Sequence, residues 1–147
     1  MSGSRYAYCV FCDDVRQEVG NKMSLMGIYG GDLRAQAQRD VPMVLPKLTI
    51  VLWIICGLED DLGDVSVKVT GPPDETPIFV TTIPASPSEA ITVREGAKRR
   101  LQNVVFELTP FPILEDGVIE VTVVAKGEEM LAGRLHVHIV EPPSAPA

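Results

Sequence analysis

The chain has 147 residues, of which 46% are apolar and 22% are charged, and its formal net charge at pH 7 is −7. These proportions are ordinary for a single soluble globular domain. Nucleic acids and anionic membrane surfaces attract basic proteins, so the acidic balance argues against both as the main partner.

The N-terminus and the cysteines point to a reducing compartment. Met1-Ser-Gly-Ser-Arg5 lacks the apolar stretch of a signal peptide, and an odd number of cysteines, three, does not make a disulfide framework. We therefore expect a cytoplasmic protein. The most apolar run, Leu48 to Gly57, has ten residues, whereas a membrane-spanning helix needs about 20. We expect this run to be a buried strand.

The predicted elements are strands separated by turns. Gly20-Asn21 predicts a two-residue hairpin turn between strands at Val15–Val19 and Lys22–Tyr29, because glycine adopts positive φ at little cost. Asp32 to Asp40 could hold one or two helical turns, with Asp32 as the N-cap. Alternating apolar and polar residues predict four further strands with one solvated face, at 65–70, 103–108, 119–123 and 134–139.

The last hairpin carries a prediction about register. Glu120 and His136 both face outward only if the numbers of paired residues sum to an even value. A two-residue loop at Gly127-Glu128 would give an odd sum and bury a charge. We therefore predict a three-residue loop or a β-bulge at this turn, with Glu120 opposite Arg134 or His136.

The spacing of these elements predicts the fold class. Seven or eight short strands at roughly ten-residue intervals are typical of an all-β fold. We predict a single-domain antiparallel β-sandwich, Ig-like or jelly-roll-like, over residues 1–140. Residues 141–147 contain three prolines, which lack the donors of a β-ladder, so we expect a flexible tail there.

Two motifs in the first segment suggest chemistry but are interpreted as structural. Cys9-Val-Phe-Cys12 matches C-x-x-C, yet residues three apart on a strand point to opposite faces, which disfavours a redox pair or a zinc knuckle. Asp13 and Asp14 diverge for the same reason and cannot share a proton. We expect Asp14 to pair with Arg16 or to cap a turn.

Three charged sets are weaker candidates. His136 and His138 share one strand face, with Glu141 three residues further on, and could bind a transition metal. We favour a solvent-facing pair. The acidic loop 59–64 could bind calcium but more often is a solvated turn. Arg94, Lys98, Arg99 and Arg100 could bind phosphate or guard an edge strand against pairing. No nucleotide-binding or hydrolase motif is present, so we assign no catalytic residue and no cofactor.

The apolar surplus of two strands requires an explanation. In a two-layer sandwich each strand has one core face, yet Lys22–Tyr29 and Leu48–Cys56 are apolar on both. The second face must be covered by the 30–46 segment, by a second subunit or by a partner. We expect self-association or a protein partner, through Met26, Ile28, Val51, Trp53 and Ile55.

The segments Phe11–Arg16, Gly20–Lys22, Ser24–Tyr29 and Asp32-Leu33 together resemble the N-terminal pattern of a family of uncharacterised bacterial proteins. The resemblance covers the first half of the chain well and the second half in strand pattern. It implies a small cytoplasmic β-sandwich and brings no activity, cofactor or site residue.

The sequence therefore favours a non-catalytic β-sandwich interaction module that self-associates. One alternative is a metal-binding protein or metal-dependent enzyme that uses His136 and His138. Another is an accessory subunit of a larger assembly, such as a phage-derived particle.

Overall fold

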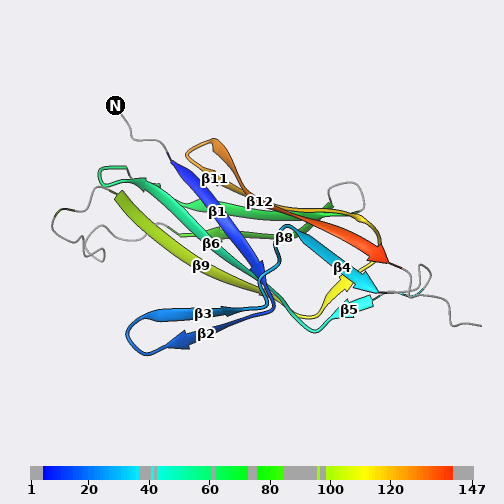
Figure 1. Ribbon diagram of the computed structural model, residues 1–147. Coiled ribbons are helices and arrows are strands. Elements are labelled where there is room, and N and C mark those ends of the chain that lie inside the picture. The colour runs from blue at the N-terminus through cyan, green and yellow to red at the C-terminus, as the bar shows by residue number, and fades with distance from the viewer. Residues whose placement is uncertain are drawn as a thin grey trace, which may run out of the picture.

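The computed structural model describes residues 5–36, 41, 43–60, 62–72, 76–84, 96 and 99–140. All regular secondary structure in these ranges is β-strand (Figure 1), which confirms the predicted all-β class. The strands are β1 (Tyr6–Cys12), β2 (Asp14–Glu18), β3 (Lys22–Met26), β4 (Asp32–Gln36), β5 (Met43–Leu45), β6 (Leu48–Gly57), β7 (Val65–Gly71), β8 (Thr76–Ile83), β9 (Arg99–Leu108), β10 (Phe111–Ile113), β11 (Gly117–Ala125) and β12 (Glu128–Val140).

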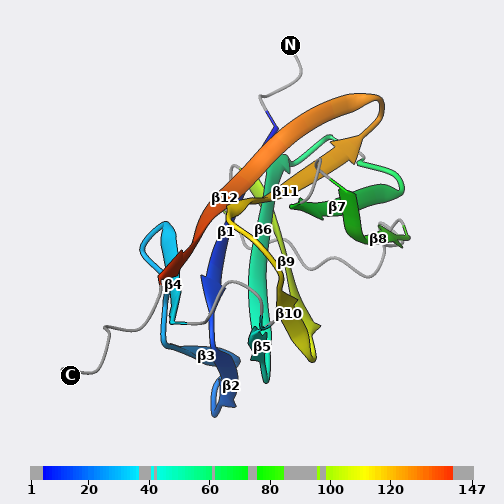
Figure 2. The same ribbon diagram turned by 90° about the vertical axis from the view of Figure 1, so that its right-hand side faces the viewer.

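Two large sheets form the body of the protein. The three-stranded sheet has the order β1-β6-β9 and is antiparallel throughout. The five-stranded sheet has the order β4-β12-β11-β7-β8 and is antiparallel except for β4 and β12, which run parallel. Figure 2 shows β12 crossing β1 at an angle, so the two sheets approach each other there.

One hydrophobic core is shared by the two large sheets. Alternate side chains of β6 point into it, and the alternating apolar residues of β7, β11 and β12 meet them from the other side. The fully buried members include Leu48, Ile50, Leu52, Ile54, Val65, Val67, Val69, Ile119, Val121, Val123 and Leu135. The period-2 pattern of the sequence is thus the pattern of the core, because successive side chains of a strand point to opposite faces.

Two small sheets lie beside this body. The β2–β3 hairpin projects away from both large sheets (Figures 1 and 2). It occurs where Gly20-Asn21 predicted a turn, with a loop that also includes Val19, and both Gly20 and Asn21 have positive φ (85° and 57°). β5 and β10 form the second small sheet, with Val44 paired to Pro112.

The pairing predicted for the last hairpin is confirmed, but the bulge lies within the strands and not at the loop. β11 and β12 connect through a two-residue loop, Lys126-Gly127, and a bulge between Val121 and Thr122 shifts the pairing by one residue. Glu120 therefore lies opposite Arg134, and their side chains form an ion pair at 3.1 Å. The bulge keeps both charges on the solvated face, as the need to avoid a buried charge required.

Other predictions need correction. The described residues form twelve strands in four sheets instead of seven or eight in one antiparallel sandwich, and β4 and β12 are parallel. Residues 32–36 form strand β4 instead of helical turns, because pairing with β12 outweighs the local capping signal. Short strands such as β5 and β10, with three residues each, are too brief to show alternation. The predicted tail, residues 141–147, and residues 37–40 lie outside the described ranges.

Candidate functional site

The segment from Phe11 to Tyr29 builds the base of the β2–β3 hairpin. The Asp13 N–H donates to the carbonyl oxygens of Met26 (2.9 Å) and Gly27 (3.2 Å), and the Tyr29 N–H donates to that of Phe11 (2.8 Å). The Tyr29 hydroxyl donates to the Asp13 carboxylate at 2.7 Å. Burial, with the Asp13 hydrogen bond second, raises the pKa of Tyr29 to about 12. Asp13 therefore has a structural role in joining the hairpin to the body.

Asp14 points elsewhere, as the strand alternation predicted. Its carboxylate forms an ion pair with Lys47, whose ammonium also lies 3.7 Å from Glu107. The hydrogen bond from Lys47 lowers the pKa of Asp14. The predicted pairing of Asp14 with Arg16 is wrong, because the Arg16 Nε lies 2.7 Å from the Glu18 carboxylate instead. The two adjacent carboxylates thus have separate partners and do not form an acid–base pair.

The three cysteines are free thiols with structural positions. Cys12 and Cys56 are buried, and Cys9 is half-buried against the core. Burial raises the pKa of Cys9 to about 12 and also raises the pKa of Cys12. A thiol that stays protonated at neutral pH is a poor nucleophile and a poor metal ligand, so Cys9-Val-Phe-Cys12 lacks the properties of a redox motif.

The two histidines are exposed on the solvated face of β12. Parallel pairing with β4 places Asp32 beside them, and the His138 Nε2 lies 3.1 Å from the Asp32 carboxylate. Among the described residues, no group of three or more His, Cys, Asp or Glu side chains is arranged to hold a metal ion. Glu141 lies outside the described ranges.

The other charged clusters are largely engaged within the chain. In the acidic loop, Asp60 pairs with Arg5, with 2.7 Å between Nη2 and Oδ1, and this hydrogen bond lowers the pKa of Asp60. Arg100 donates to the Leu58 carbonyl at 2.8 Å. The Arg99 guanidinium lies 5.6 Å from the centre of the Tyr6 ring. Arg94, Lys98 and Asp61 lie outside the described ranges.

The outer face of the three-stranded sheet is the most unusual surface of the described structure. It is the side opposite the core, and the strand registers arrange its side chains in rows across β1, β6 and β9. The rows are Tyr6–Ile55–Leu101, Tyr8–Trp53–Asn103 and Val10–Val51–Val105. Eight of these nine side chains are apolar or aromatic, which is unusual for the solvent side of an antiparallel sheet.

The accessible part of this outer face comes from the two flanking strands. Tyr6, Tyr8 and Leu101 are 46%, 44% and 62% exposed, and Trp53 is half-buried. The rings of Tyr8 and Trp53 stack at 5.1 Å with an angle of 16° between their planes. Stacked rings are held in place before a partner arrives, so binding would cost little side-chain entropy.

The corresponding face of the five-stranded sheet is mixed: Val80 and Leu131 are exposed (58% and 46%) among charged side chains. Its exposed or half-exposed side chains include Lys68, Glu120, Arg134, His136 and His138. Glu120 and Arg134 pair across strands. Opposite charges on a wet sheet face are the ordinary arrangement of an antiparallel sheet. The two large sheets therefore differ in one respect: charged side chains are interspersed on this face, whereas the three rows of the three-stranded sheet contain none.

The predicted interaction residues separate into two groups. Met26 and Ile28 are exposed (39% and 59%), whereas Val51 and Ile55 are buried within the chain and offer no surface to a partner. This correction has a simple cause: β6 is the middle strand, so side chains of β1 and β9 flank its outer residues on both sides. Tyr6, Tyr8 and Leu101 were not predicted, although Tyr6-Ala-Tyr8-Cys-Val10 shows the alternation that identifies such a face.

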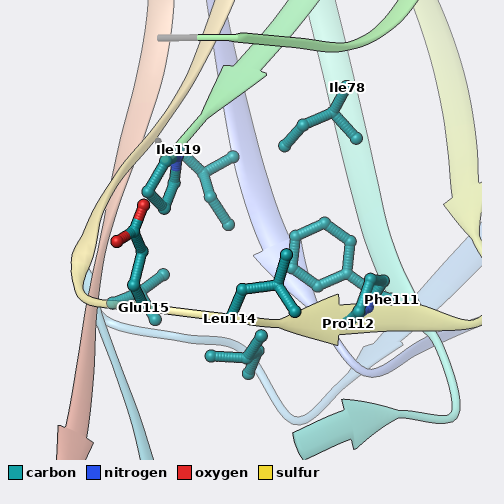
Figure 3. A pocket seen from close by; sticks show the side chains of 9 residues that line it. Ile78, Phe111, Pro112, Leu114, Glu115 and Ile119 are labelled. Atoms are coloured by element: carbon teal, nitrogen blue, oxygen red, sulfur yellow. The ribbon is translucent and has the colours of Figure 1, made fainter. Parts of the chain in front are cut away.

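An apolar hollow of about 120 Å³ opens between β8, β10 and the start of β11 (Figure 3). Ile78, Phe111, Leu114 and Ile119 point into it, and the Glu115 carboxylate stands at its side. The remaining lining residues are Pro72, Pro112, Ile113 and Val137. Glu115 is the one titratable group in this lining, so the hollow offers an apolar contact and no pair of groups for acid–base catalysis.

The fold and these surfaces define an all-β protein with two large sheets, a projecting hairpin and one apolar outer face. Within the described ranges it has no helix of the length and apolarity that crossing a bilayer requires. The chain belongs to a family of unknown function (DUF6941), whose model matches residues 7–138. This match agrees with the expected membership of an uncharacterised family and extends from β1 into β12. A comparison with curated proteins gave no match.

Proposed function

We propose that this chain is a non-catalytic β-sandwich interaction module that self-associates through the outer face of its three-stranded sheet. The observation that carries the proposal is the contrast between the two solvated sheet faces. On one face, charged side chains such as the Glu120–Arg134 pair lie among Val80 and Leu131, whereas the rows of the other hold no charge and present Tyr6, Tyr8, Trp53 and Leu101. Contiguous apolar surface of this kind marks interaction sites on soluble proteins.

The kinds of residue on this face also favour binding. Tyrosine and tryptophan are enriched among the residues that contribute most to protein–protein affinity, because they bury large areas with few rotatable bonds. Arg99, at the end of the same face, lies over Tyr6, and arginine is the third residue type enriched at such positions. The face thus combines rigid rings with an aliphatic side chain at the β9 edge.

The non-catalytic part of the proposal has separate support. The thiols are buried with raised pKa values, the adjacent carboxylates of Asp13 and Asp14 have structural partners, and the apolar hollow contains one carboxylate. Three free cysteines are consistent with a reducing compartment, which supports the expected place of the protein in the cytoplasm.

Light scattering coupled to size exclusion, over a wide range of protein concentration, tests self-association. We expect a mass that rises from monomer toward dimer. Leu101→Asp should hold the protein at the monomer mass, because it places a charge in the apolar rows. Leu131→Asp is the matched control: Leu131 is also exposed (46%) but lies on β12 of the other sheet. A wild-type protein that stays monomeric throughout would refute the proposal, as would equal effects of the two substitutions.

A further inference from the structure

β9 is a long strand at the edge of its sheet. Its ten residues pair with β6 along one side, and no described strand pairs with its other side. An unpaired edge presents backbone N–H and C=O groups in the spacing of a β-ladder and is a template for another strand. β9 carries no proline and no bulge along this length, so its edge is regular.

The outer side chains of β9 are complementary to themselves in reverse order. Arg99, Leu101, Asn103, Val105 and Glu107 alternate with the core-facing residues. In chain order they are positive, apolar, polar, apolar and negative. A strand of this kind matches an antiparallel copy of itself, because its two ends carry opposite charges and its centre is symmetric.

We propose that two copies of this chain associate through an antiparallel pairing of β9 with β9, centred on Asn103. The proposal rests on the proposed function and specifies how two copies meet: they pair along the β9 edge, and this pairing sets the two outer faces side by side. A two-fold axis at Asn103 places Arg99 of each copy opposite Glu107 of the other and Leu101 opposite Val105. The two three-stranded sheets then form one continuous six-stranded sheet, with β9 and its copy at the centre.

The register centred on Asn103 pairs the outer side chains of β9 more favourably than the registers shifted by one or two residues. A shift by one residue would place core-facing side chains of one copy on the outer face of the other. A shift by two in one direction sets Leu101 opposite Glu107, and in the other direction sets Arg99 opposite Val105. Among the outer side chains, only the pairing centred on Asn103 matches every charge with an opposite charge and every apolar side chain with another.

The pairing also joins the two outer faces. The row Tyr6–Ile55–Leu101 of one copy continues into Val105–Val51–Val10 of the other, and the Tyr8–Trp53–Asn103 row meets its own copy. The apolar rows thus become continuous across the two-fold axis. Charge complementarity fixes the register, and the exposed Leu101 side chain gains an apolar neighbour.

Cysteine cross-linking tests the register directly. Directly opposite residues in an antiparallel pair have Cα atoms about 4.5–5.5 Å apart, within disulfide range. We expect Asn103→Cys to form a covalent dimer under mild oxidation. Leu101→Cys is the control, because two such residues would be offset by four positions, roughly 13 Å along the strand. The wild-type protein measures any cross-linking through its own three cysteines, two of which are buried.

Charge reversal provides a second, independent test. Arg99→Glu and Glu107→Arg should each raise the dimer dissociation constant roughly tenfold, because two symmetry-related pairs become repulsive. The double variant restores both pairs with exchanged charges and should return the constant toward the wild-type value. Lys68→Glu and Glu129→Arg, exposed residues of the five-stranded sheet, are controls for the change in net charge. Far-ultraviolet circular dichroism confirms that each variant folds.

The possible results separate this inference from the proposed function. Cross-linking at position 103 and not at 101, with rescue by the double reversal, supports the β9 pairing. A wild-type dimer that is sensitive to Leu101→Asp but does not cross-link at position 103 overturns the β9 pairing and leaves the interaction face in place. A dimer with no rescue in the double variant overturns the register. A wild-type monomer at all concentrations overturns both.

Discussion

Gly133 lies where β12 crosses β1, and replacing it tests how closely the two large sheets approach. A Cβ atom at this position would lie 2.6 Å from the Cys9 sulfur and 3.6 Å from both the Cys9 carbonyl oxygen and the Phe11 ring. The first distance is far below van der Waals contact, so Gly133→Ala must displace Cys9 or separate the sheets. Cys9 is half-buried against the core, so moving its sulfur disturbs the packing there.

The size of the effect follows from two opposing contributions. Overpacking of a well-packed core costs about 1–3 kcal/mol. Replacing glycine with alanine also lowers the entropy of the unfolded chain, which stabilises the protein by about 0.4–1 kcal/mol. We therefore expect a net loss of roughly 1–2 kcal/mol in the free energy of unfolding, or a fall in Tm of roughly 3–6 °C for a domain of this size.

Urea unfolding followed by the fluorescence of Trp53, the one tryptophan of the chain, measures this loss. All variants are compared at one protein concentration, because self-association would add to apparent stability. Gly30→Ala is the matched control, since no atom lies within 4 Å of its added Cβ. In the double variant, Cys9→Ala removes the sulfur, so Gly133→Ala should cost less there than in the wild type. If Gly133→Ala were as stable as Gly30→Ala, or if Cys9→Ala gave no relief, the close approach would be refuted.

Three further predictions concern stability. Arg5→Gln should destabilise the protein at pH 7 and have no effect at acidic pH. The hydrogen bond from Arg5 lowers the pKa of Asp60, so the pair stabilises the fold above pH 3.8, the ordinary pKa of the carboxyl, and this contribution is lost as the pH falls through the folded pKa. An effect independent of pH would contradict this. Between pH 9 and about 12 the free energy of unfolding should fall as the pH rises, since burial raises the pKa of Cys9 from 9.0 to about 12. Urea titrations at alkaline pH should show a less steep fall for Cys9→Ala. An unchanged slope would count against the burial of that thiol. Gly27→Ala should lower Tm more than Gly63→Ala. Both glycines have positive φ (67° and 62°), but the added Cβ would clash with Asp13 at Gly27 and would meet no atom within 4 Å at Gly63. Equal losses would show that backbone conformation alone determines the effect.

The sequence determined the elements that depend on local pattern. Period-2 alternation located β7, β9, β11 and β12, since each has one face toward the core. The need to keep Glu120 and His136 in water predicted a three-residue loop or a β-bulge, with Glu120 opposite Arg134 or His136, and the structure has the bulge and the Arg134 pair. The divergence of Asp13 and Asp14 followed from strand geometry in the same way. These features depend on residues that are near in the chain or on one buried face.

Tertiary structure alone decided which strands are neighbours. Nothing local to Asp32–Gln36 shows that it pairs in parallel with the C-terminal strand, because that pairing depends on where β12 lies after the chain has folded. The same holds for the outer face: the apolar surplus of β6 was visible in the sequence, but Val51 and Ile55 became buried once β1 and β9 flanked them. The most exposed apolar side chains of this face are instead Tyr6, Tyr8 and Leu101, because exposure depends on a residue's neighbours in space as well as on its own chemistry.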